Sequence, residues 1–199
     1  MHQNLVAIVK EYVYKLRIRN VELRIMFENE DDYYKSRDEI KKMPVYKKAW
    51  EIRLLADKIT EVAGNTDIHE SEVEQSMFGD TISYLRQNAM IIPVKIASAE
   101  AVELYDLKME NAAIIRKAAR ELLTDSTGMK MHGFKDHDYI QLLRDEVKAF
   151  RVLFAEWVKT FDEWNYIIDR WGLFNPPGVN YDDHDPDDDI PFNPDDFFE

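Results

Sequence analysis

The chain has 199 residues, no cysteine, six glycines, seven prolines and a formal net charge of -13. This length supports one hydrophobic core with an appended segment rather than two full domains. The lack of cysteine excludes thiol nucleophiles, thiolate metal sites and disulfides, and the scarcity of turn residues disfavours a sandwich or barrel. The sequence has neither a signal-peptide core nor roughly 18 consecutive uncharged apolar residues, so we expect a cytoplasmic protein.

The first 43 residues predict an N-terminal helical extension. Apolar side chains recur at three- and four-residue steps from Leu5 to Phe27, which is the spacing of one face of a helix. The acidic run 28–32 and a polar stretch then separate this segment from the body, residues 44–173.

The body begins with a helix that Pro44 opens and Gly64 stops. A further apolar series runs from Val73 to Leu122 and contains Pro93, which lacks an amide donor and clashes with the preceding turn. We therefore expect a kink or a break at Pro93, and the pattern leaves open whether residues 73–123 form one bent helix or two. The glycines within residues 124–135 predict a loop.

The last apolar series, from Tyr139 to Trp171, predicts a helix of about nine turns, roughly 50 Å long at 1.5 Å per residue. Long helices with modest loops pair most easily as antiparallel neighbours, so the predicted fold is all-α, an up-down antiparallel four-helix bundle. We interpret the aromatic stripe of this helix as core; aromatic residues on a second face would mark an oligomer interface.

No catalytic or metal-binding constellation is recognisable in the sequence. None of the five histidines has a Glu three residues before it, as the di-iron bundles require, and no Arg is followed by His within seven positions. Gly-rich phosphate loops, nucleophile elbows and zinc-helix motifs are also missing. We therefore expect a non-enzymatic protein without catalytic residues, cofactor or metal.

Two stretches of the body resemble a known family. They are Val45-Tyr46-Lys47-Lys48-Ala49-Trp50-Glu51-Ile52 and the segment 86–100, in which Ile92, Pro93, Ile96 and Ala97 have the family's spacing and Ala101 stands where the family has glycine. The family is that of the four-helix bundles encoded in intervening sequences of bacterial 23S ribosomal RNA genes, together with the accessory variability determinant of diversity-generating retroelements. Over residues 44–172 the resemblance implies a ring-forming bundle and, in the retroelement branch, binding of a reverse transcriptase and its RNA.

Candidate nucleic-acid contacts are basic residues spread over several predicted helices, because phosphate binding requires Lys and Arg on one face. Most alternate with acids, which also fits a solvated surface. The candidates are Arg17, Arg19, Lys47, Lys48, Arg116, Lys117 and Arg120.

Residues 174–199 form an acidic tail with prolines and phenylalanines. The tail holds nine of the 39 acids and no Lys or Arg, so residues 1–173 retain 30 acids against 26 bases. Its composition predicts an extended arm that either solubilises the chain or docks into basic, apolar-lined pockets, and 187–192 is similar to the acidic tip of bacterial single-stranded-DNA-binding proteins. The candidate partner-binding residues are Asp187, Asp188, Asp189, Ile190, Phe192, Phe197 and Phe198.

Two functional hypotheses follow from these features. In the first, the protein is a homo-oligomeric helical scaffold or accessory protein that recruits a nucleic-acid-processing partner, such as a reverse transcriptase with RNA. In the second, it is an adaptor or inhibitor whose acidic aromatic tail occupies the basic site of a DNA- or RNA-processing protein, as a DNA mimic would. The two differ in whether binding survives removal of the tail.

Overall fold

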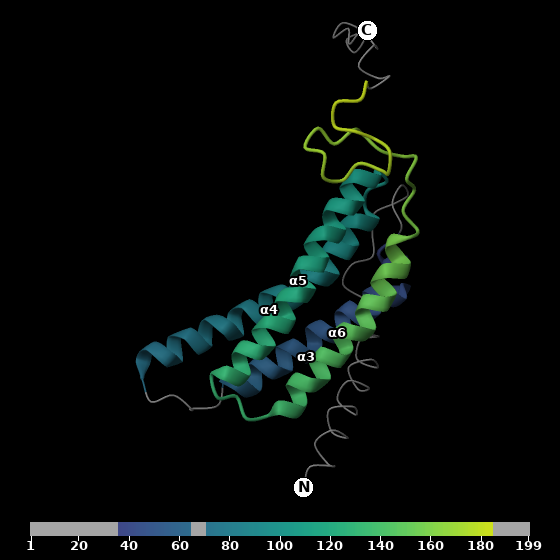
Figure 1. Ribbon diagram of the computed structural model, residues 1–199. Coiled ribbons are helices and arrows are strands. Elements are labelled where there is room, and N and C mark those ends of the chain that lie inside the picture. Colours follow the sequence, from purple (N-terminus) through teal and green to yellow (C-terminus); the bar gives the residue numbers. More distant parts are fainter. Residues whose placement is uncertain (1–35, 65–70, 185–199) are drawn as a thin grey trace, which may run out of the picture.

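The computed structural model describes residues 36–64 and 71–184, and this part of the chain is helical without strands (Figure 1). The predicted all-α class is therefore confirmed for the described residues. Most of the first 43 residues and the predicted tail-docking residues lie outside them. The helices are α2 (Arg37–Lys42), α3 (Pro44–Gly64), α4 (Glu72–Glu100), α5 (Tyr105–Met131) and α6 (His137–Val158).

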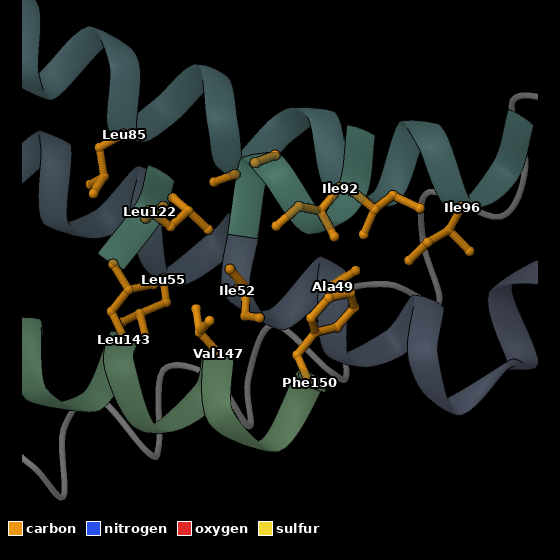
Figure 2. Close-up of a cluster of buried hydrophobic side chains, with 14 of the residues drawn as sticks. Ala49, Ile52, Leu55, Leu85, Ile92, Ile96, Leu122, Leu143, Val147 and Phe150 are labelled. Atoms are coloured by element: carbon orange, nitrogen blue, oxygen red, sulfur yellow. The ribbon is translucent and has the colours of Figure 1, made fainter. Parts of the chain in front are cut away.

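Four long helices share one core. Helix α3 packs against α4 and α6, and α5 packs against the same two helices, so that α3 and α5 occupy opposite corners. The chain reverses direction from each of these helices to the next (Figure 1). Figure 2 shows that Ile52 of α3, Ile92 of α4, Leu122 of α5 and Phe150 of α6 point into a shared interior.

The short helix α2 precedes the bundle and was not predicted from the apolar pattern. The backbone N–H of Ser36 donates to the Glu39 carboxylate at 3.0 Å, which is half of a capping box, and Ile40 is buried. The signal in the sequence was the Ser-x-x-Glu spacing rather than hydrophobic periodicity.

Of the kink or break expected at Pro93, the break is wrong. Pro93 lies inside α4 and is buried, whereas residues 73–123 divide into two helices at the turn 101–104. A proline within a helix forfeits one hydrogen bond, but here it packs in the core between Ile92 and Ile96, both fully buried, and burial offsets that loss.

The loop expected over residues 124–135 is also largely wrong, because α5 continues to Met131. The Ser126 and Thr127 hydroxyls donate to the Leu123 carbonyl within the helix. At Gly128 an added Cβ would lie 3.3 Å from Thr81 Cγ2, so this glycine allows α5 to approach α4 closely. The helix stop is Gly133, whose φ of 88° suits glycine after a helix end.

Polar side chains join the helices as well. Asn88 of α4 donates to Asp125 Oδ2 of α5 at 2.9 Å. Burial raises the pKa of the Asp125 carboxyl, the Asn88 hydrogen bond partly offsets this, and the charge of Glu121 raises it further. Arg144 of α6 donates to the Leu123 carbonyl at 3.1 Å, which links α6 to α5.

Truncation of Phe150 should be strongly destabilising, because its ring is 2% exposed among residues of several helices. We expect Phe150→Ala to lower the free energy of unfolding by about 3–5 kcal/mol. Val152→Ala, on the same helix at a side chain that is 63% exposed, should change it by less than about 0.5 kcal/mol. Urea unfolding followed by circular dichroism measures both, and equal losses would contradict the core assignment.

Asp125→Asn should stabilise the protein at neutral pH. The pKa of Asp125 is higher in the folded state than its ordinary value of 3.8. The free energy of unfolding therefore falls as pH rises from 3.8 through the folded-state pKa, because the carboxyl ionises less readily in the folded protein. The amide removes that charge and keeps an oxygen for Asn88. The variant should melt above wild type at pH 7 and level with it at pH 3.5, whereas Asp80→Asn, an exposed control on α4, should shift neither melt.

Candidate protein-interaction surface

Residues 159–184 do not continue α6 but fold over one end of the bundle (Figure 1). Phe161 and Ile168 are buried there. The amide of Tyr105, at the start of α5, donates to the Asn165 carbonyl at 2.7 Å, so the loop satisfies a donor that a helix N-terminus leaves unpaired. The Ile167 amide donates to Asp106 Oδ1 at 3.2 Å. The predicted nine-turn helix to Trp171 is therefore wrong after Val158.

A buried hydrogen bond lies at the point where the chain leaves α6. Trp157 Nε1 donates to Glu100 Oε1 at 2.6 Å, which joins the end of α6 to the end of α4. The Phe161 ring packs edge-on against Trp157 with centroids 4.9 Å apart, and Lys108 Nζ lies 5.5 Å from the Phe161 centroid. Aromatic and cation–π contacts of Phe161 together hold the loop to the end of α6 and the first turn of α5.

The Asp169 carboxylate organises the second half of the loop. It accepts hydrogen bonds from the amides of Trp171, Leu173 and Phe174 at 2.9 to 3.0 Å. The Asn175 side chain accepts from the Asp169 amide at 2.7 Å and donates to its carbonyl at 2.9 Å. The pKa of Asp169 is lowered, and the hydrogen bond from the Trp171 amide is the largest cause. Partial burial opposes this effect, and the amides of Leu173 and Phe174 add to it.

The end of the described chain is bound to the same loop. Arg170 Nη1 donates to the carbonyls of Tyr181 and Asp183 at 3.0 and 2.8 Å. Gly172 has a φ of 70°, and an added Cβ would meet the Tyr181 Cβ at 3.4 Å. These hydrogen bonds run across residue 174, where the predicted tail begins, so residues 174–184 belong structurally to the loop.

This hydrogen-bonded loop presents large apolar side chains to solvent. Trp164 is 91% exposed and Trp171 is 89% exposed. Exposed apolar side chains that lie together mark binding sites, and Gly172, next to Trp171, lies against Tyr181. We call this group the tryptophan surface: Trp164, Ile167, Trp171, Leu173 and Tyr181.

A second set of exposed apolar residues lies on α4. Val73, Met77 and Tyr84 are separated by four and seven residues, which places them on one side of the helix. The first turns of α4, from Glu72 to Met77, are exposed on every side. We call these three residues the α4 stripe.

The predicted nucleic-acid contacts are not brought together. Arg17 and Arg19 lie outside the described residues. Lys47 is exposed on α3, while Lys48 donates to Glu51 and Glu146, each at 2.7 Å. The remaining three are exposed on α5, at the opposite corner of the bundle from α3: Arg116, Lys117 and Arg120.

Burial lowers the pKa of Lys48, whereas the hydrogen bonds to Glu146 and Glu51 raise it. The pKa of Lys48 is raised overall. This lysine is therefore engaged in an ion pair between α3 and α6 rather than offered to a phosphate. Lys117 also pairs with Glu121 at 3.6 Å, which leaves Arg116 and Arg120 as the basic pair of α5.

The predicted tail contacts, from Asp187 to Phe198, lie outside the described residues. Within the described ranges, no group of three or more His, Cys, Asp or Glu residues is arranged to hold a metal ion. None of the helices in those ranges combines the length and hydropathy of a membrane span. Comparison of the chain with family models, curated proteins and solved structures gives no match.

The sequence contained one signal for this loop that hydrophobic periodicity concealed. Asp162 and Asp169 each accept the amide two residues further on, those of Trp164 and Trp171. Such side-chain hydrogen bonds offer the backbone an alternative to a helix, and Asn165 falls between them in the chain. Asp162, Asn165 and Asp169 therefore favoured turns in a segment whose apolar spacing favoured a helix.

Asp169→Ala should loosen the tryptophan surface without unfolding the bundle, because it removes the acceptor of three backbone amides. We expect hydrogen exchange at Leu173 and Phe174 to accelerate about tenfold or more, while the core amides of α3 keep their protection. Asp182→Ala, an exposed acid on the same loop, is the matched control. Unchanged exchange at both amides would contradict the role given to Asp169.

Proposed function

We propose that the chain is a non-enzymatic scaffold protein, an up-down antiparallel four-helix bundle that recruits a protein partner through the tryptophan surface. The observation that carries this proposal is the exposure of Trp164 and Trp171 on a loop that is fixed by hydrogen bonds. The alternating chain direction and the contacts of each long helix with two neighbours support the bundle topology.

A fixed loop with exposed tryptophans suits protein recognition for an energetic reason. Tryptophan is among the residues that most often dominate interface affinity, because it buries a large rigid ring. The hydrogen bonds to Asp169 order the loop before binding, so association loses less conformational entropy than a flexible loop would lose.

Homo-oligomerisation is part of the proposal, and the α4 stripe supports it. Its side chains are exposed along an overhanging helix end, a geometry that a second helix can cover. Ring assembly is also what the family resemblance of residues 44–172 implies.

The partner that we propose is a nucleic-acid-processing protein, such as a reverse transcriptase. This identity rests on the family resemblance, since nothing in the described site is specific to nucleic acid. Direct contact with RNA or DNA would involve Arg116 and Arg120 on α5, which are exposed and adjacent on that helix.

The alternative is an adaptor or inhibitor that acts through its tail. The observation favouring it is the composition of residues 185–199, which contain seven acids and no Lys or Arg. A segment of that charge would fit the basic site of a nucleic-acid-processing protein.

Mass by light scattering, combined with affinity capture from the source lysate, tests the proposal. The full chain and a version ending at His184 should both form a discrete oligomer and retain the same nucleic-acid-processing partner. Trp164→Ala/Trp171→Ala should reduce capture about tenfold or more, whereas Val152→Ala should not.

Two outcomes would overturn the proposal. A monomer whose partner disappears with residues 185–199 would favour the tail mechanism. Capture that is indifferent to both tryptophans would exclude the tryptophan surface as the recruiting site. Thermal melts of each variant establish that the bundle remains folded, which is expected because both replaced side chains are exposed.

A further inference from the structure

The charges around the tryptophan surface define the kind of partner segment that it fits. Residues 159–184 contain five acids and two bases. Asp162 and Glu163 are exposed immediately before Trp164, and Asp182 is exposed immediately after Tyr181. The exposed aromatic residues are therefore flanked in the sequence by exposed acids.

The two bases leave residues 159–184 with a net charge of -3, because five acids outnumber them. Arg170 donates to the carbonyls of Tyr181 and Asp183, where it holds the loop together, and it keeps its positive charge. Lys159 pairs with Glu156 of α6 at 2.8 Å. The Glu163 carboxylate also acts on Tyr105, whose pKa is raised by burial and then by that charge.

We infer that the tryptophan surface binds an arginine- or lysine-rich segment of a partner protein. A guanidinium or ammonium group is attracted to the face of an indole ring, and nearby carboxylates strengthen that attraction. Both exposed tryptophans lie within two residues of an acid in the sequence, Trp164 next to Glu163 and Trp171 after Asp169. This inference rests on the proposed recruitment through the loop and adds the chemistry of what is recruited.

The same charges disfavour the other occupants of an aromatic surface. Single-stranded nucleic acid stacks on exposed aromatic residues only where a basic groove tracks its phosphates, and here the flanking side chains repel phosphate. An anionic membrane surface would be repelled for the same reason. The chain that follows continues the acidic character, since residues 185–199 carry seven acids.

Fluorescence anisotropy with a labelled peptide of six Arg-Gly repeats tests the inference on the full chain. A Gln-Gly peptide of equal length and a labelled thymidine oligonucleotide are the comparison probes. We expect the Arg-Gly peptide to bind at least about tenfold more tightly than either, with affinity falling as salt rises.

Variants separate the tryptophan surface from unspecific attraction to an acidic chain. Trp164→Ala/Trp171→Ala preserves every charge and should weaken Arg-Gly binding about tenfold. Val152→Ala, at an exposed side chain on α6, should leave it unchanged, and truncation after His184 should weaken it less than the tryptophan variant does.

Binding that ignores the tryptophans and is lost with residues 185–199 would overturn the inference in favour of the tail. Preferential binding of the oligonucleotide would overturn it in favour of nucleic acid. If the peptide does not bind and the chain instead self-associates through both tryptophans, seen as a mass that rises with concentration, the inference is overturned. The occupant of the surface would then be a second copy of the chain. Lysate capture that needs the tryptophans while the Arg-Gly peptide fails would leave the proposed recruitment standing and this inference refuted.

Discussion

The hydrogen bond from Trp157 to Glu100 joins the last turns of α6 and α4 inside the protein. The Glu100 carboxylate has little access to water and needs a hydrogen-bond donor. A buried polar group without a hydrogen bond costs more free energy than the hydrogen bond itself contributes. The indole of Trp157 supplies that donor and, on its other side, the surface on which Phe161 packs. The chain leaves α6 immediately after this contact, and the loop that carries the tryptophan surface begins there.

Two kinds of constraint hold the loop in place, and they act on different parts of it. Near the bundle, burial of Phe161 and Ile168 and hydrogen bonds with the Tyr105 amide and the Asp106 carboxylate of α5 hold residues 159–168. Farther out, little apolar surface is buried, and the Asp169 carboxylate and Asn175 amide provide the order instead. The outer part can therefore present bare aromatic side chains without collapsing onto the core, which is the property that partner recognition requires.

In the proposed function, the helical body and the two exposed apolar surfaces have different roles. Core residues from four helices give a stable platform, and the ion pair of Lys48 with Glu146 shows that one predicted phosphate contact serves packing between helices. The remaining basic residues of α5 are the single exposed pair Arg116 and Arg120, whereas residues 159–184 carry five acids. The proposed recognition is consequently of basic protein rather than of nucleic acid itself, even where the partner processes nucleic acid.

The sequence by itself determined the helical class and the bounds of α3, because apolar side chains at three- and four-residue spacing tend to be buried together. Val73 and Met77 follow the same spacing on α4, yet both are exposed. The sequence could not place the break after Glu100 or the end of α6. At Pro93 and Gly128, local preference for a break was outweighed by burial and by close approach between α4 and α5. Beyond Val158 the helical apolar pattern continues through Trp164 and Trp171, and only the tertiary structure decided that this segment turns. A longer helix would have left Phe161 and Ile168 without the end of the bundle to cover them, and Asp162 and Asp169 supplied the competing hydrogen bonds.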